Sequence, residues 1–351
     1  MATTFKALTP ADVVNTRTLL HEAVPITGTI VTGTYASNGN IKNFSHGMFQ
    51  SVYDYPYLSS SANHIFDVTA GYSSKSAYSS STNNQNAKKI NIYNEMAQVL
   101  VGFDHTGSVR EFDQDGDLSG GSKLKEVLFL NFSRLLTKDE VKKSSFTMSL
   151  ATGGTANSPD FANLKTISDY GATTKYKVNS PAGEYGILYT GSEALAGTGV
   201  GLIYYQAGIA IITGSVFYPR TAPFAEFGDS GAVYDKRTFD VVLTGSEISA
   251  SAEGFRNRLY NVAFDNTTEL NSTIYFCRAH HNDFNYSSNP TYLNNSKIRV
   301  KGDQKKNQPI SYVTAVGLYS DNNELLAVAK LSEPLKKTPS GELTLRVRLD
   351  Y

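Results

Sequence analysis

Cysteine is almost absent from the chain, and tryptophan is absent altogether. A single cysteine among 351 residues allows no internal disulfide framework, so nothing in the sequence indicates an oxidising compartment. Charged residues make up only 18% of the chain, which argues against a long, highly charged disordered segment. The 32 basic side chains balance the 32 acidic ones, whereas a free-standing nucleic-acid-binding protein normally carries a basic excess. We therefore expect no nucleic-acid partner. A neutral chain also has little electrostatic protection against self-association.

Segments that would direct the chain to a membrane are also missing. The first residues, MATTFKALTPADVV, contain no apolar core of the kind that a signal peptide has. The longest uncharged run, Val200–Phe217, is interrupted by three glycines and by Gln206, and it is rich in residues that favour strands. We interpret it as two buried strands with a turn near Gln206–Gly208, and we expect no membrane partner.

The residues that are abundant indicate a β-rich protein. Hydrophobic residues make up 40% of the chain, and it contains 22 tyrosines, 18 phenylalanines and 28 glycines. This composition predicts an all-β to α+β fold, with antiparallel sheets in sandwich-like modules and a few short helices. A length of 351 residues is enough for two packed modules.

Helix signals are clearest in two segments, and a further capping pattern at Thr137–Glu140 leaves room for only a short turn of helix before Ser144. Thr9–Asp12 has the capping pattern Thr-Pro-Ala-Asp, which predicts a helix from about Pro10 to Ala23. In Asn91–Phe103, apolar residues recur at helical spacing, which predicts a second helix. The resulting division is an N-terminal helical arm (1–25), a central β-rich domain (26–270) and a C-terminal antiparallel β module (271–351).

The clearest strands lie near the C-terminus, where Ser311–Tyr319, Glu324–Leu331 and Glu342–Leu349 are separated by turn-forming residues. Leucine and valine alternate with polar residues in the last strand, so one face is predicted to be apolar and the other to carry Arg346 and Arg348. Because arginine is favoured at protein interfaces, these two side chains are candidate interface residues. Further strands are predicted at Glu126–Leu136, Phe146–Leu150, Gly186–Thr190, Asp240–Thr244 and Ser272–Arg278.

The most specific enzymatic signal is the sequence Gly-Asp-Ser-Gly at residues 228–231. It resembles the nucleophile loop of chymotrypsin-like serine proteases, in which Ser230 would be the nucleophile, with His64 (or His46) as base and Asp104 as orienting acid. The sequence around each histidine departs from the pattern of that family. A turn formed from common turn residues explains the motif more simply, so we expect no catalytic site.

Alternating carboxylates mark a second candidate site. Asp113, Asp115 and Asp117 surround Gly116, and such a turn could gather oxygen ligands for Ca²⁺. Leu118 and Leu124 stand where an EF-hand loop requires glycine and glutamate, so the loop is not an EF-hand. An acidic surface turn is the simpler interpretation, and we expect no metal and no cofactor.

Several long segments resemble virion proteins of contractile-tailed, T4-like and marine bacteriophages. The resemblance is carried by Tyr312–Tyr319, Glu324–Pro334 and the basic-alternating last strand, with Phe284–Thr291 just upstream. Two other runs, NFSHGMFQSVYDYPYLSSSANHIFDVTAGYS and KEVLFLNFSRLLTKDEVKKSSFTMSL, also resemble phage structural proteins. Together these stretches cover about half of the chain.

The resemblance implies a non-enzymatic building block of a phage tail, baseplate or collar. Such a protein would be made in the bacterial cytoplasm and would reside in the virion, as a homo-oligomer in contact with other phage structural proteins. Three alternatives remain open at this point: the chymotrypsin-like hydrolase, a head or neck connector, and a receptor-binding spike module.

Overall fold

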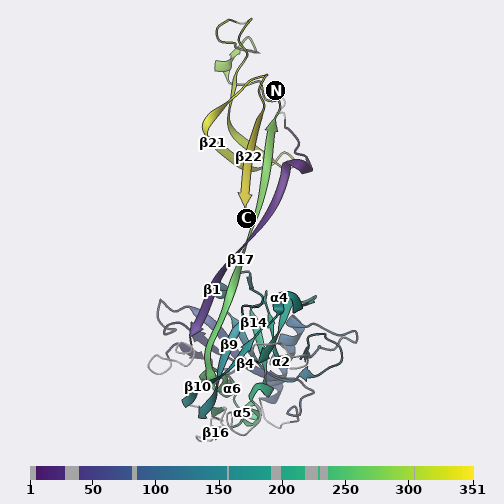
Figure 1. The fold of residues 1–351 in the computed structure, drawn as a ribbon, viewed down its shortest axis with the longest axis vertical. Coiled ribbons are helices and arrows are strands. Elements are labelled where there is room, and N and C mark those ends of the chain that lie inside the picture. The colour runs from purple at the N-terminus through teal and green to yellow at the C-terminus, as the bar shows by residue number, and fades with distance from the viewer. Residues whose placement is uncertain are drawn as a thin grey trace. The chain divides into compact units, whose positions relative to one another are not determined.

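Strands dominate a computed structural model of the chain, which describes residues 5–27, 39–80, 85–155, 158–190, 199–217, 228–229, 236–303 and 305–351 (Figure 1). Strands account for 47% of the described residues and helices for 17%. All pairings between the described strands for which a register is defined are antiparallel. The predicted β-rich, antiparallel fold class is therefore confirmed.

The chain divides into two compact units. Unit 1 combines Met1–Leu19 with Glu269–Tyr351, and unit 2 is Leu20–Thr268. Two strands, β1 (Val13–Thr27) and β17 (Leu259–Ala279), run through the division points. The N-terminal segment therefore belongs to the same unit as the C-terminal strands.

The predicted N-terminal helix is wrong. The Thr9 amide and hydroxyl both donate to Asp12 Oδ2, at 3.1 and 2.6 Å, so the capping pattern does form. Only the single 3₁₀ turn η1 (Pro10–Asp12) follows it, and β1 then begins at Val13. Valine and threonine recur in this segment and favour an extended backbone, and β17 supplies a strand for β1 to pair with.

A single large sheet organises unit 2, in the order β17-β9-β10-β12-β13-β14-β7-β4-β3-β2. The strands that belong to unit 2 alone are β2 (Ile41–Asn43), β3 (Gln50–Tyr53), β4 (His64–Tyr72), β5 (Phe112–Asp113), β6 (Lys123–Leu124), β7 (Glu126–Phe132), β8 (Glu140–Val141), β9 (Thr147–Thr155), β10 (Ser158–Ser168), β11 (Lys177–Asn179), β12 (Gly183–Thr190), β13 (Gly199–Tyr204), β14 (Ile209–Thr213), β15 (Gly228–Asp229) and β16 (Lys236–Arg237). Strands β13 and β14 confirm the two buried strands predicted from the uncharged run.

The central strands of this sheet are buried on both faces. In β7, Val127 and Phe129 pack in one apolar cluster, whereas Leu128, Leu130 and Phe132 pack in the other. This two-sided burial explains why the sequence of β7 is almost continuously apolar instead of alternating. Among the described residues, no helix is long and apolar enough to cross a membrane.

Helix α2 (Asn86–Leu100) packs on β4 and covers part of this sheet. The predicted helix is therefore present, but it begins and ends earlier than expected. Ile92 and Leu100 are buried, whereas Val99 and Phe103, which were assigned to the same apolar face, are exposed. The close approach requires Gly71, because a Cβ atom there would lie 2.7 Å from the carbonyl oxygen of Lys89.

The other helices of unit 2 are α3 (Arg134–Thr137), α4 (Ala172–Lys175), α5 (Phe239–Thr244) and α6 (Ile248–Arg258), with the 3₁₀ turn η3 (Gly214–Phe217). The strand predicted at Asp240–Thr244 is wrong, because this segment forms α5. Its apolar residues Phe239, Val242 and Leu243 are spaced three and one apart, so a helix buries all of them together in the core.

Unit 1 contains β20 (Ser311–Tyr319), β21 (Leu325–Lys337), β22 (Leu343–Asp350), the short pair β18 (Leu293–Asn294) and β19 (Lys297–Ile298), and the 3₁₀ turn η4 (Pro290–Tyr292). Strands β20 and β21 form a separate two-stranded sheet, and β22 pairs with the end of β17. The three strands predicted at the C-terminus are therefore confirmed.

Candidate functional site

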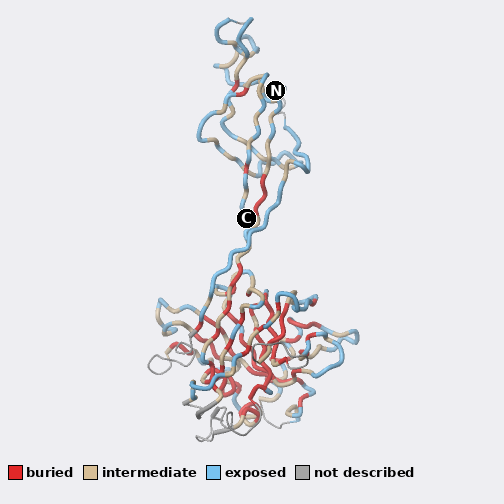
Figure 2. The backbone as a smooth tube through the Cα atoms, in the orientation of Figure 1, coloured by how far each residue is buried: buried red, intermediate tan, exposed pale blue. Residues whose placement is uncertain are grey.

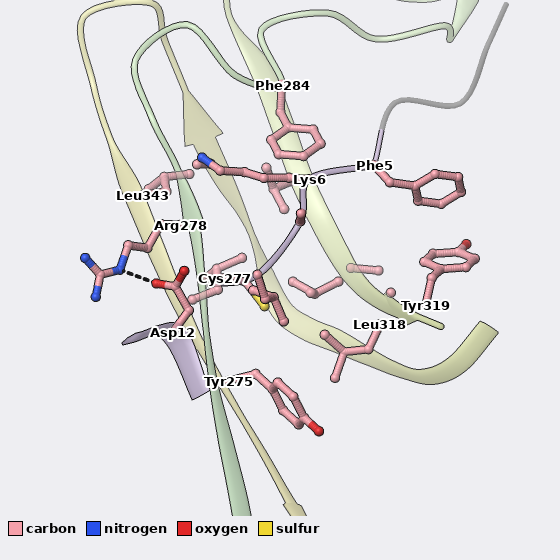
Figure 3. A pocket seen from close by; sticks show the side chains of 18 of the residues that line it. Phe5, Lys6, Asp12, Tyr275, Cys277, Arg278, Phe284, Leu318, Tyr319 and Leu343 are labelled. Carbon is pink, nitrogen blue, oxygen red and sulfur yellow. Dashed lines mark ion pairs between the residues drawn. The ribbon is translucent and has the colours of Figure 1, made fainter. Parts of the chain in front are cut away.

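An open groove lies within unit 1, with a volume of about 1010 Å³. Its walls come from the N-terminal segment, β17, β20 and β22, and Figure 3 shows side chains from these segments facing the same space. Strand β22 contributes Leu343, Leu345 and Leu349, which are the alternating leucines of its apolar face. Strand β17 contributes Tyr275 and Cys277. The apolar face of β22 and side chains of β17 therefore border the groove.

Ion pairs and an aromatic contact hold the N-terminal segment against this groove. The Phe5 ring lies 4.7 Å, centroid to centroid, from the ring of Tyr319. Lys6 Nζ lies 2.5 Å from Asp283 Oδ2. The hydrogen bond from Lys6 lowers the pKa of the Asp283 carboxyl, so this carboxylate stays charged at neutral pH.

A second pair ties η1 to β17. Arg278 Nε lies 2.9 Å from Asp12 Oδ1 (Figure 3). The hydrogen bonds from Thr9 lower the pKa of Asp12, and the nearby Arg278 acts in the same direction. The capping pattern that was expected to begin a helix therefore positions a carboxylate for an ion pair with β17.

Unit 1 has very little buried core of its own. Among its described residues, Ile274 and Val347 are the only buried apolar residues, and they still expose 9% and 8% of their surface. Figure 2 shows the same contrast, because buried backbone is concentrated in unit 2 and most of unit 1 is exposed or intermediate. Leu326 on β21 is 68% exposed and Val328 is 53% exposed. A large apolar area of unit 1 is therefore left open to solvent.

The alternation predicted for β22 is present. Arg346 and Arg348 are exposed, and Val347 between them is buried. Arg348 has an acidic partner in its own strand, because its Nε donates to Asp350 Oδ1 at 2.7 Å. No ion pair involves Arg346 in the described part of the chain, so its guanidinium remains available for a partner.

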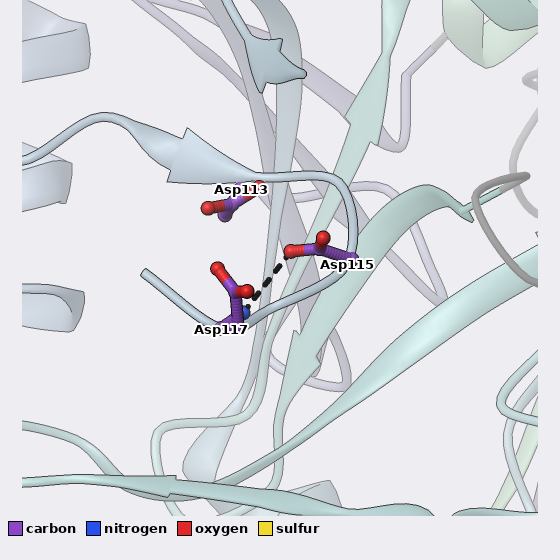
Figure 4. A group of neighbouring side chains, drawn as sticks. All are labelled: Asp113, Asp115 and Asp117. Carbon is purple, nitrogen blue, oxygen red and sulfur yellow. Dashed lines mark hydrogen bonds between the residues drawn. The ribbon is translucent and has the colours of Figure 1, made fainter. Parts of the chain in front are cut away.

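The aspartate cluster forms in the loop between β5 and β6 of unit 2. One carboxylate oxygen from each of Asp113, Asp115 and Asp117 lies within 4.8 Å of the others, and Figure 4 shows the three side chains gathered inside the loop. Asp113 is completely buried, and burial raises the pKa of its carboxyl. Glu111 does not join them, because its carboxylate bonds to the hydroxyl of Ser73.

The described residues of the hydrolase hypothesis each contact other groups and not one another. His64 Nε2 lies 2.8 Å from Asp67 Oδ1, and the Ser51 hydroxyl donates to the same oxygen at 2.5 Å. The Asp104 carboxylate instead accepts hydrogen bonds from Thr106 and Ser108 within its own turn. Ser230 lies outside the described residues. The alternative base, His46, accepts a hydrogen bond from the Met48 amide and stacks on Phe44.

Two features of unit 1 were not predicted from the sequence. The N-terminal segment was assigned to a helical arm, so its contacts with β17 and β20 were not anticipated. The exposed apolar residues of β21 did leave a signal in the sequence, because Leu325, Leu326 and Val328 place apolar side chains on both faces of the strand. Such a departure from period two indicates a second buried face or an interface.

Comparisons with known proteins returned no relatives. No protein-family model matches the chain, and neither the curated proteins nor the solved structures contain a match.

Proposed function

We propose that this chain is a non-enzymatic structural protein of a tailed-bacteriophage virion, located in the tail, baseplate or collar. In this proposal the protein acts through contacts made by unit 1. The observation that carries the proposal is the open apolar groove, together with the scarcity of buried apolar side chains around it. A unit of this size normally encloses its own core, so neighbouring subunits would complete the burial.

The surface chemistry of unit 1 supports a protein partner. Unit 1 exposes leucine, valine and tyrosine side chains, and it also exposes Arg346, whose guanidinium can pair with a carboxylate across an interface. Aromatic residues and arginine are enriched at interfaces, and apolar contacts at their centre exclude water. The virion setting is supported by the resemblance of the C-terminal strands to phage structural proteins.

Replacing exposed apolar residues of β21 tests the proposed interface. The double variant Leu326→Ser, Val328→Thr removes apolar area that is open to solvent in the single chain, so the fold should persist. We expect the unsubstituted chain to sediment as an oligomer and the variant to shift towards the monomer. Circular dichroism should be unchanged.

A matched control lies in unit 2, where Leu135 is 68% exposed and Val99 is 66% exposed. The variant Leu135→Ser, Val99→Thr removes the same groups at similar exposure, and it should sediment like the unsubstituted chain. If the unsubstituted chain and both double variants sediment equally, the proposed interface is wrong. Immunogold labelling of purified phage particles tests the setting separately, and absence of the chain from the particles would overturn the virion assignment.

A further inference from the structure

The loop between β5 and β6 is held in place by contacts outside its carboxylates. The Tyr185 hydroxyl donates to the carbonyl oxygen of Gly116 at 2.7 Å. The side-chain amide of Gln114 donates to the carbonyl oxygen of Gly199 at 2.9 Å, and its backbone amide donates to Ser122 at 3.0 Å. These contacts add to the hydrogen bonds that Asp115 and Asp117 accept within the loop, from the Asp117 amide at 3.2 Å and the Ser119 amide at 2.8 Å.

Negative charge is concentrated inside this loop and is only partly neutralised. Asp113 Oδ2 pairs with Lys123 Nζ. Asp113 Oδ1 is buried and has no hydrogen-bond partner among the described residues. Asp115 and Asp117 add two further carboxylates within 4.8 Å, and among the described residues Lys123 is the one cation that forms an ion pair with any of the three. A buried oxygen without a donor is costly, so this position favours a positively charged ligand.

Gly121 keeps a space open beside these oxygens. A Cβ atom at this position would lie 3.3 Å from Asp113 Oδ1 and 3.4 Å from Asp115 Oδ2. The orphaned oxygen of Asp113 and a carboxylate oxygen of Asp115 therefore border the same space next to the glycine. The carboxylates converge towards the interior of the loop, as Figure 4 shows.

We propose that Asp113, Asp115 and Asp117 bind a Ca²⁺ ion. Calcium is the cation that fits best, because the donors are all oxygens, come from one irregular loop, and can be supplemented by backbone carbonyls and water in a coordination shell of variable geometry. The loop lacks the final bidentate glutamate of an EF-hand, since Leu124 occupies that position. We therefore expect a modest dissociation constant of roughly 0.1–1 mM. This site is independent of the proposed interface in unit 1.

Calorimetric titration of the full chain with CaCl₂ tests the proposal. We expect one ion per chain and a melting temperature that rises with Ca²⁺ and falls on chelation. Asp115→Asn keeps the size of an exposed side chain but removes its charge, and it should weaken Ca²⁺ binding at least about tenfold, the scale on which a lost charged ligand acts. Terbium luminescence excited through tyrosine provides a local readout, because Tyr185 contacts the loop and the chain contains no tryptophan.

Two adjacent glycines supply a matched pair of variants. Gly120 and Gly121 have φ angles of +59° and +61°, so alanine is similarly strained at either position. A Cβ atom at Gly120 has no neighbour within 4 Å, whereas one at Gly121 approaches two carboxylates. Gly121→Ala should abolish the Ca²⁺-dependent rise in melting temperature, and Gly120→Ala should retain it. If Ca²⁺ at 10 mM (about ten times the weakest expected dissociation constant) produces neither heat nor stabilisation, or if Asp115→Asn binds as well as the unsubstituted chain, the proposal is wrong.

Discussion

One buried carboxylate of unit 2, that of Asp169, is surrounded by hydrogen-bond donors. Asp169 is buried, and its carboxylate accepts hydrogen bonds from the Ser144 amide at 2.7 Å, the Phe146 amide at 3.1 Å and the Tyr205 hydroxyl at 3.0 Å. Burial nevertheless outweighs these donors and raises the pKa of Asp169 to about 6. The folded state therefore binds this proton more tightly than the unfolded state does.

The raised pKa of Asp169 predicts a pH dependence of stability. Between the unfolded pKa of 3.8 and the folded pKa of about 6, the folded state holds more protons, so the free energy of unfolding should fall as the pH rises through this window. The full difference is about 3 kcal/mol. Denaturant titrations at pH 4 and pH 7 should show this fall for the unsubstituted chain but not for Asp169→Asn. As a control, Asp160→Asn at an exposed position should keep the pH slope of the unsubstituted chain. If Asp169→Asn shows that same slope, the prediction is wrong.

Residue spacing in the sequence identified the aspartate cluster but not its environment. The one-residue intervals of Asp113, Asp115 and Asp117 predicted that carboxylates would gather in a turn, and they do. The burial of Asp113 depends on how the loop packs against strands that are distant in the sequence. The spacing of the aspartates alone could not indicate this burial.

Secondary-structure elements were predictable where alternation or turn chemistry was strong. The C-terminal strands β20, β21 and β22 are flanked by turn residues, and they lie close to their predicted positions. The sequence was misleading at Pro10–Ala23, where a real capping pattern precedes a strand, because the pairing of β1 with β17 decides the structure there. It was also misleading for α5, whose short apolar run fits either state.

The buried lysine Lys89 connects α2 to the C-terminal end of α5. Lys89 is fully buried, and its Nζ donates to the carbonyl oxygens of Leu243 and Gly245, the latter at 2.7 Å. The ammonium thus satisfies carbonyls at the C-terminus of α5 that the helix itself leaves without donors. Burial lowers the pKa of Lys89 to about 8, so the group is still mostly charged at neutral pH.

Replacement of this lysine should lower the free energy of unfolding. Lys89→Met would leave two buried carbonyl oxygens without a donor, and we expect the free energy of unfolding to fall by about 2–4 kcal/mol. Lys88→Met, at the neighbouring exposed position, should change it by less than about 0.5 kcal/mol. Urea denaturation of both variants measures the difference, and equal effects would show that the contacts of Lys89 contribute little.

At the scale of the whole molecule, the two units differ in how they are stabilised. Unit 2 holds apolar clusters on both faces of its sheet, whereas unit 1 relies on ion pairs, strand pairing and an incompletely filled apolar space. Buried Lys337 in unit 1 illustrates this, because its Nζ donates to His281, Asn285 and Thr338 and so fixes the end of β21 by polar contacts.

This difference predicts unequal amide hydrogen exchange. In the free chain, amides of β20, β21 and β22 should exchange faster than those of β4 and β7, because few buried apolar contacts oppose local opening in unit 1. If unit 1 forms the proposed interface, the β20–β22 amides should become protected on association, while those of β4 and β7 should change little. Slow exchange of β20–β22 in the dissociated chain would contradict this, because it would mean that unit 1 is stable without a neighbour.

The interleaving of the units along the chain has a consequence for biosynthesis. Unit 2 is contained within residues 20–268, so the ribosome has released all of its strands and helices before it makes β20. Unit 1 must instead wait for β22, because residues 343–350 supply the partner of β17 and a wall of the groove. Domains generally fold as units during synthesis. A nascent chain would therefore fold unit 2 first and complete unit 1 last. If unit 1 forms the proposed interface, this order would delay contact between neighbouring polypeptides on the same messenger RNA.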